Sequence, residues 1–249
     1  MDNAVVADDD MEQLRSEHER ILAMPGRAAI IRLRRLSRTL RVFHGNAEAL
    51  LAHLRQMDDV GRMLATTTDP EAFEEFGAET ERHLHNFVAA AQSRVDHLRQ
   101  FARAEWPEDA PTRQEYERRV EQEFRTSPLH NFIIRLRQLM QHVRLPLSTT
   151  RETWERGGAW TFRVMLDSAD LLRWKDWNAP ARSYIQASGE AVDLAQTVAT
   201  YSNETQTFDR WVAEEFVREH LGEIESYMEA ARQFRERLRR LGLDDLETA

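Results

Sequence analysis

Apolar residues recur at every third or fourth position along most of the chain, which is the spacing of helices with one buried face. One such stripe consists of Ile30, Leu33, Leu36, Leu40 and Phe43. The spacing predicts helices at about residues 14–24, 30–44, 47–64, 70–106, 112–124 and 128–145, and a long helical stretch over 191–241 with a break near 202–203. Two shorter helices are expected to begin at Ser168 and after Asn178.

Capping and helix-breaking residues mark the ends of these helices. Pro25-Gly26 is expected to end the first helix and Gly45-Asn46 the second, because proline and glycine interrupt helices. Asp69-Pro70 combines an N-cap side chain with a proline at the first helical position, and Ser127-Pro128 opens a later helix. Regular helices of this kind pack into bundles that bury their apolar faces.

The period changes to two between Trp160 and Leu166, where apolar and polar residues alternate as in a half-buried strand. Arg156-Gly157-Gly158 and a threonine-rich run at 149–154 precede this segment, so we expect a β-hairpin. The predicted fold is therefore an all-α multi-helix bundle with one small β-hairpin excursion. Its segments are a bundle over 1–147, the hairpin over 148–166, and C-terminal helices over 167–249 that pack back on the bundle. An isolated hairpin is marginally stable, so this one should lean on the bundle or on a partner.

The composition allows a folded core and excludes several kinds of site. The chain has 249 residues, of which 41% are apolar and 31% charged, so a core of ordinary size can form. Cysteine is absent, which excludes disulfides, zinc fingers and cysteine nucleophiles. The only lysine, Lys175, follows Trp174, so the Gly-Lys pair of a Walker A loop is missing. Glu-x-x-His pairs and histidines four residues apart are also missing, and we expect no metal and no cofactor.

The N-terminal sequence MDNAVVADDD is acidic and lacks the basic start and apolar run of a signal peptide. The longest apolar stretches have four or five residues, too few to cross a bilayer. Together with the absence of cysteine, these features predict a cytoplasmic protein without a membrane partner.

Charge is strongly segregated within a chain whose net charge is −9. Residues 20–47 contain seven arginines and residues 124–151 contain five, and neither window contains a carboxylate. Clustered arginines are typical of surfaces that bind phosphate, above all that of nucleic acid. The windows could equally pair with the acidic helices predicted at 71–81 and 105–123, or bind an acidic protein partner.

The helix predicted at 128–145 carries the candidate chemistry. Its apolar stripe is Leu129, Phe132, Ile133, Leu136, Met140 and Val143. A polar stripe, spaced four, three and four residues apart, consists of Asn131, Arg135, Gln138 and His142, with Arg137 at its margin. An imidazole can move the proton of an RNA 2′-hydroxyl while a guanidinium holds the phosphate charge, and neither step needs a metal.

The run Arg137-Gln-Leu-Met-Gln-His142 resembles the Arg-x4–6-His motif of the HEPN superfamily, small helical bundles found in many prokaryotic toxins and defence proteins. The resemblance implies a metal-independent ribonuclease that acts as a homodimer, with Arg137 and His142 of both protomers in one cleft. His142 would be the general acid or base, Arg137 would hold the phosphate with Arg135 as its substitute, and Gln138 would position the pair or the scissile phosphate. Gln138 stands where the family often has Asn, Asp or His. Arg135, Arg144 and Asn131 are the candidate RNA-binding residues beside them.

Each of these residues also has a plainer interpretation. His142 and Arg144 would stabilise the C-terminal turn of the helix as cations near its negative dipole end. The tryptophans at 154, 160, 174 and 177 suit packing as well as base stacking. The rival to a ribonuclease is therefore a non-enzymatic helical interaction module, whose basic helix faces bind an acidic protein partner.

Overall fold

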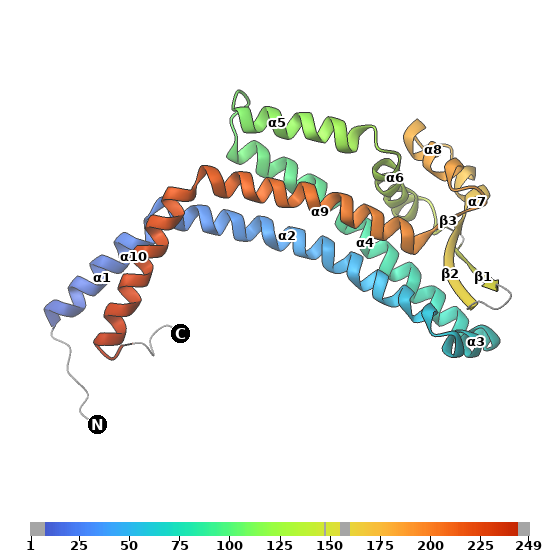
Figure 1. Cartoon of the computed structure of the whole chain (residues 1–249), viewed down its shortest axis with the longest axis horizontal. Helices are drawn as coiled ribbons and strands as arrows, with labels where there is room; N and C mark the ends of the chain where they lie inside the picture. The colour runs from blue at the N-terminus through green and yellow to red at the C-terminus, as the bar shows by residue number, and fades with distance from the viewer. Residues whose placement is uncertain (1–7, 147, 155–159, 244–249) are drawn as a thin grey trace. The chain divides into compact units, whose positions relative to one another are not determined.

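The computed structural model describes residues 8–146, 148–154 and 160–243 (Figure 1). Helices dominate these residues and the strands form one small antiparallel sheet, which confirms the predicted all-α bundle with a β excursion. The chain divides into two compact units. Unit 1 comprises Met1–Ser37 and Trp211–Ala249, and unit 2 comprises Arg38–Arg210. Both ends of the chain thus belong to the same unit.

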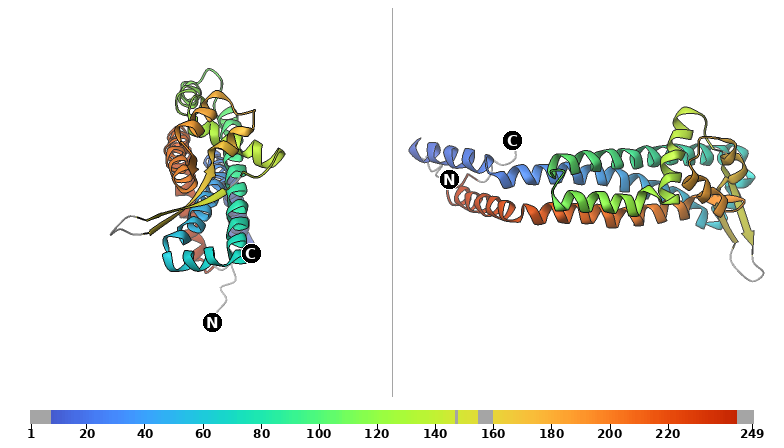
Figure 2. Two further views of the ribbon diagram at one scale, coloured as in Figure 1. Left: turned by 90° about the vertical axis from the view of Figure 1, so that its right-hand side faces the viewer. Right: turned by 90° about the horizontal axis from the view of Figure 1, so that it is seen from above.

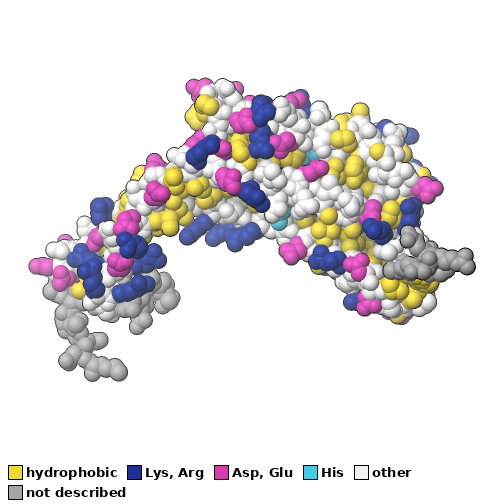
Figure 3. All heavy atoms as spheres, in the orientation of Figure 1, with side chains coloured by type: hydrophobic (Ala, Val, Ile, Leu, Met, Phe, Trp, Pro, Cys, Tyr) yellow, Lys and Arg dark blue, Asp and Glu magenta, His cyan; other side chains and the backbone are white. Residues whose placement is uncertain are grey.

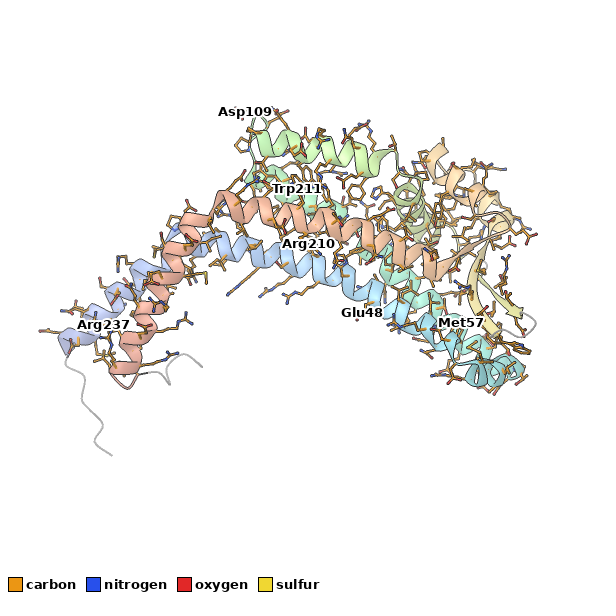
Figure 4. All side chains as sticks on the ribbon, in the orientation of Figure 1. Glu48, Met57, Asp109, Arg210, Trp211 and Arg237 are labelled. Atoms are coloured by element: carbon orange, nitrogen blue, oxygen red, sulfur yellow. The ribbon has the colours of Figure 1, made fainter. Side chains whose placement is uncertain are left out.

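Unit 1 is built from α1 (Asp8–Leu22), α10 (Leu221–Arg240), the start of α2 (Pro25–Leu54) and the end of α9 (Leu194–Glu219). The ring of His18 on α1 stacks on Phe234 of α10 at 5.5 Å between centroids. Arg237, labelled in Figure 4, pairs with Glu17 at 2.9 Å. Gly26 lies so close to α10 that a Cβ there would overlap the Glu223 carbonyl group. The missing side chain of Gly26 therefore allows α2 to approach α10.

The core of unit 2 lies among α2, α9 and the long helix α4 (Pro70–Glu105), which run side by side in Figures 1 and 2. One ring from each helix meets at its centre. The centroid of Phe43 lies 5.8 Å from that of Phe87 and 5.9 Å from that of Tyr201, and all three side chains are fully buried. A 3-10 turn, η1 (Arg55–Asp58), and α3 (Val60–Thr68) connect α2 to α4.

Shorter helices complete unit 2: α5 (Pro111–Val120), the π-helical turn η2 (Glu121–Arg125), α6 (Pro128–His142), α7 (Ser168–Arg173) and α8 (Ala179–Ala187). The predicted caps are confirmed, since the side chains of Asp69, Ser127 and Asn178 accept hydrogen bonds from backbone N–H groups of the helices that follow them. Basic and acidic side chains lie next to one another over α5 (Figure 3).

The predicted hairpin consists of β1 (Ser148–Trp154) and β2 (Trp160–Asp167), paired with Arg151 opposite Arg163. Its expected turn at 156–158 lies outside the described residues. Phe162, Val164 and Leu166 of β2 are buried in the core of unit 2, so the hairpin leans on the bundle as expected. A third strand, β3 (Ala191–Asp193), pairs with the end of β2. The helical stretch predicted over 191–241 included these three residues, so its start is wrong.

Several predicted helix boundaries are wrong, and the single helix expected over 47–64 is divided among the end of α2, η1 and α3. The break expected at Gly45-Asn46 is absent: α2 continues to Leu54, and the Asn46 amide donates to the Val42 carbonyl at 2.8 Å within the helix. The break expected near residues 202–203 lies at His220, between α9 and α10. Finally, α6 ends at His142, three residues early, because the N–H of Val143 and of the residue after it both bond to the Leu139 carbonyl.

Within the described residues, no helix is both long and apolar enough to pass through a membrane.

Candidate functional site

A hollow of about 550 Å³ lies at the C-terminal end of α6. It is lined by Arg135, Arg137, Gln138, His142 and Val143 on one side and by Trp174, Asp176 and Trp177 on the other. Trp174 is the C-cap residue of α7, and Asp176 and Trp177 belong to the loop that leads to α8. Helix α8 packs against α6. The structure thus brings the predicted catalytic residues to the wall of one open site, which we call the α6 hollow.

The apolar face of α6 determines which side chains reach the hollow. Phe132, Leu136 and Leu139 are completely buried and fix the rotation of the helix. Positions 135, 138 and 142 then share a face that points away from the core. Val143 was expected in the apolar stripe but is exposed, because the helix has ended before it.

The loop across the hollow is anchored by Trp177. Its indole Nε1 donates to the Leu171 carbonyl at 2.7 Å, and its ring stacks on Phe132 of α6 with 5.6 Å between centroids. Trp174 packs edge-on against Trp177 at 4.9 Å and stays half-buried. Because both rings are held, Trp174 presents a fixed aromatic surface to the hollow.

Arg137 and His142 are free to bind a ligand. His142 is exposed and Arg137 is half-buried. Among the residues that the structure describes, neither side chain has a hydrogen-bond or ion-pair partner. A guanidinium and an imidazole without protein partners retain their full capacity for an incoming phosphate group.

Gln138 contacts Arg135 instead of the predicted pair. Its Oε1 accepts a hydrogen bond from the Arg135 guanidinium at 2.7 Å. This contact holds the second arginine of the hollow against α6 and leaves the remaining donors of that guanidinium available.

Asn131 and Arg144, predicted to bind RNA, do not line the α6 hollow. The Asn131 amide donates to the carbonyls of Arg125 at 3.0 Å and Ser127 at 2.9 Å, and its oxygen accepts from Asn178 at 2.6 Å. Arg144 binds both the carboxylate of Asp170 at 2.6 Å and the backbone carbonyl of the same residue at 2.7 Å. Their contacts join α6 to neighbouring segments, and an RNA-binding role for either stays a prediction.

Asp176 was not among the predicted site residues, and the four tryptophans were distinguished only as a group. Trp174 and Asp176 follow His142 by more than thirty positions, and no local period connects them with α6. Trp160 lies near Phe162 in the sheet, 6.2 Å between centroids, and the side chain of Trp154 lies outside the described residues. The clustering of tryptophans in the sequence was the available signal for an aromatic site. Only the packing shows that Trp174 is the partly buried ring at the hollow.

The acidic helices satisfy much of their charge internally. Glu115 pairs with Arg118 at 2.6 Å, and Glu79 pairs with Arg82 at 2.6 Å, each one turn away. Arg38 and Arg41 of the first basic window are exposed on α2, where Figure 3 shows a group of basic side chains. Within the described residues these two arginines have no carboxylate partner. They therefore form an open basic face.

In contrast to the exposed Arg38 and Arg41, one arginine of unit 2 is buried. Arg94 is only 2% exposed and donates from Nε to the two carboxylate oxygens of Asp209 at 2.8 and 3.0 Å. His44 contacts the same carboxylate through Nε2 at 3.1 Å. The Arg94 guanidinium also lies 5.5 Å from the ring centroid of Phe124 and 6.0 Å from that of Phe208. We call this group the Arg94 cluster.

His130 lies next to the Arg94 cluster. Burial, together with the positive charge of Arg94, lowers the pKa of His130 to about 4, so its ring is neutral near pH 7. Its Nδ1 faces the hydroxyl of Tyr201 at 3.1 Å. Burial raises the pKa of Tyr201, which keeps that hydroxyl protonated.

The described residues contain no group of three or more His, Asp and Glu side chains placed to hold a metal ion. His53 and His83 line one pocket, with their ring centroids 5.2 Å apart. His53 Nε2 contacts the hydroxyl of Thr80 at 2.9 Å. Burial, and then the neighbouring His83, lower the pKa of His53.

Comparison with protein-family models, with curated proteins and with solved structures gives no match for this chain. The functional assignment therefore depends on the residues of the α6 hollow themselves.

Proposed function

We propose that the α6 hollow binds RNA and cleaves it without a metal ion, as a cytoplasmic ribonuclease of the toxin or defence type. The observation that carries this proposal is the meeting of Arg135, Arg137 and His142 with Trp174 around one open hollow. The arginines would hold a phosphate by charge-assisted hydrogen bonds. Trp174 would stack against a neighbouring base, a contact that RNA-binding proteins use for unpaired nucleotides.

The cleavage step follows from the chemistry of RNA. The 2′-oxygen attacks the adjacent phosphorus, the bond from phosphorus to the 5′-oxygen breaks, and a 2′,3′-cyclic phosphate and a 5′-hydroxyl result. His142 as neutral imidazole would accept the proton of the 2′-hydroxyl. Arg137 would stabilise the extra negative charge on the phosphate oxygens in the transition state.

The step also requires a proton donor for the departing 5′-oxygen. One imidazole cannot accept a proton and hold a different one at the same moment, so a second acid is needed. We propose that His142 of a second copy supplies it in a homodimer. The resemblance of the Arg137–His142 segment to the HEPN motif supports the same arrangement.

The test is cleavage of a fluorescent single-stranded RNA in EDTA by the wild type, by His142→Ala and by His97→Ala. His97 is an exposed histidine of α4 outside the hollow, so it is the matched control. We expect the wild type and His97→Ala to give 2′,3′-cyclic phosphate ends, and His142→Ala to lose at least 100-fold in rate, about the contribution of one general acid or base. Equal cleavage by all three proteins, or none by the wild type, would reject the assignment.

A second candidate is an interaction module that binds an acidic protein through α2. The open basic face formed by Arg38 and Arg41 favours it, because unpaired surface arginines attract acidic partners. In that case Arg38→Glu would abolish binding to the acidic partner, whereas His142→Ala would not change it. The variants Arg38→Glu and His142→Ala together therefore distinguish the two candidate functions.

A further inference from the structure

A second pocket, of about 630 Å³, lies between α4, α5, η2, α6 and α9. Both sites touch α6, but no residue lines both: His130 and Asn131 of α6 face this pocket, and Arg135, Arg137, Gln138 and His142 face the α6 hollow. Five arginines and two glutamates line it, together with apolar and aromatic side chains. Figure 3 shows basic and apolar side chains together beside α5. We call it the α4–α5 pocket.

Part of the positive charge in the α4–α5 pocket is not neutralised by the protein. Arg113 pairs with Glu117 and Arg125 with Glu121, each at 2.7 Å. Arg99 has only a loose contact with Asp96, 3.8 Å apart, in which both side chains are about half exposed. Such pairs are weak in water.

Arg103 is the second cation without local neutralisation. It is exposed, and it has no carboxylate partner within the described part of the chain. Arg99 and Arg103 are four residues apart on α4 and so lie on the same helix face. Two adjacent guanidinium groups of this kind form a docking point for a phosphate group.

A second part of the lining consists of packed aromatic side chains. Tyr116 of α5 lies against Phe208 of α9 at 5.6 Å and against Trp106 at 6.1 Å between centroids. Phe124 belongs to the π-helical turn η2, a type of distortion that is frequent at functional sites. Burial raises the pKa of the Tyr116 hydroxyl, so that it stays protonated and can donate a hydrogen bond.

The positive charge at the buried end of the pocket is already neutralised by the protein. Arg94 reaches it, but the carboxylate of Asp209 neutralises that charge. The ligand charge must therefore be met at the rim, by Arg99 and Arg103, while its body faces Leu98, Val120 and the aromatic wall. The volume is within the usual range of pockets for small molecules.

We infer that the α4–α5 pocket binds a small free phosphate ester with a flat apolar body, as in a nucleoside monophosphate. The phosphate would bind Arg99 and Arg103, and the body would lie in the apolar part of the pocket. This inference is independent of the proposed cleavage, because it involves none of the residues of the α6 hollow.

The experiment is calorimetric titration of the full-length protein with adenosine 5′-monophosphate, adenosine and inorganic phosphate as probes. We expect saturable binding of the monophosphate, at least about tenfold tighter than that of adenosine or of inorganic phosphate, since both parts of the pocket contribute. Arg103→Gln should weaken it at least about tenfold, the loss of one charged phosphate contact, and Arg99→Gln should act in the same direction. Arg41→Gln on α2 removes the same charge outside the pocket and should change the affinity less than about twofold.

Three outcomes would overturn the inference: no saturable binding of the monophosphate, binding of phosphate alone with equal affinity, or equal weakening by Arg41→Gln. Unfolding temperatures of all variants control for folding, and Arg99 and Arg103 are exposed enough to be replaced without loss of the core. His142→Ala should bind the monophosphate like the wild type. Binding that Arg103→Gln weakens and His142→Ala leaves unchanged belongs to the α4–α5 pocket, whereas the reverse result would place the monophosphate in the α6 hollow and overturn this inference without touching the proposed ribonuclease.

Discussion

Unit 2 contains arginine next to histidine in two contrasting environments. In the Arg94 cluster the guanidinium is buried, bound to Asp209 and surrounded by phenylalanine rings. In the α6 hollow the half-buried Arg137 and the exposed His142 line an open site and have no protein partners among the described residues. The same residue types thus serve packing where water is excluded and remain available to a ligand where it is not.

The difference follows from the cost of removing a charge from water. A buried guanidinium is tolerated only when a carboxylate and further hydrogen bonds replace its hydration. Once they do, the charge of the guanidinium is neutralised within the protein. An exposed guanidinium has no such requirement, so it can exchange water for phosphate at little cost. Variants of both regions test this contrast.

The largest effect is expected at Asp209. Asp209→Leu would leave Arg94 buried without its counter-charge and should lower the free energy of unfolding by about 3–5 kcal/mol. Combining it with Arg94→Leu should restore a large part of the loss, because the remaining site is apolar. Urea denaturation of both variants measures this, and a double variant as unstable as Asp209→Leu would contradict the account.

The next effect concerns pH. The pKa of His130 is lowered to about 4, so between pH 6.5 and 4 the unfolded chain binds the proton more readily than the folded one. Stability is therefore fully present above pH 6.5 and falls as the pH decreases toward 4. Between pH 7 and pH 5 the loss due to His130 is about 2 kcal/mol. His130→Phe should flatten this part of the pH dependence in urea denaturation, and an unchanged slope would exclude the neutral buried ring.

A smaller effect is expected for Arg144. Its pair with Asp170 is one-third exposed on the arginine side, so Arg144→Ala should cost about 1 kcal/mol of stability. RNA cleavage should persist if the residue is structural only. A variant of unchanged stability with impaired RNA binding would instead support the role predicted from the sequence.

The smallest change in stability is expected in the α6 hollow. Arg137→Ala and His142→Ala should alter the free energy of unfolding by less than about 0.5 kcal/mol, as is usual for surface side chains without partners. Their effect should fall on RNA cleavage. Thermal denaturation checks the first statement, and a strongly destabilised His142→Ala would place that ring in the packing of the protein.

Local patterns along the chain account for most of the helices. The i, i+3, i+4 spacing of apolar residues and the caps at Asp69, Ser127 and Asn178 act within a few residues, so they are legible in the sequence. Glycine was a poorer guide. Gly45 was expected to end a helix, but α2 continues through it because Phe43, Ala47 and Leu50 are all buried on the same face. The energy of that burial exceeds the modest helix penalty of one glycine.

The sequence by itself determined the helical class, the hairpin and the polar stripe of α6, because each depends on neighbours along the chain. Only the tertiary structure decided which arginines are neutralised and which are open. Arg94 meets Asp209 across 115 positions, and Trp174 meets the face of His142 across a sheet and a helix. Such contacts depend on how the helices pack against one another. Residues far apart in the chain that meet in this way produce no repeating pattern in the sequence.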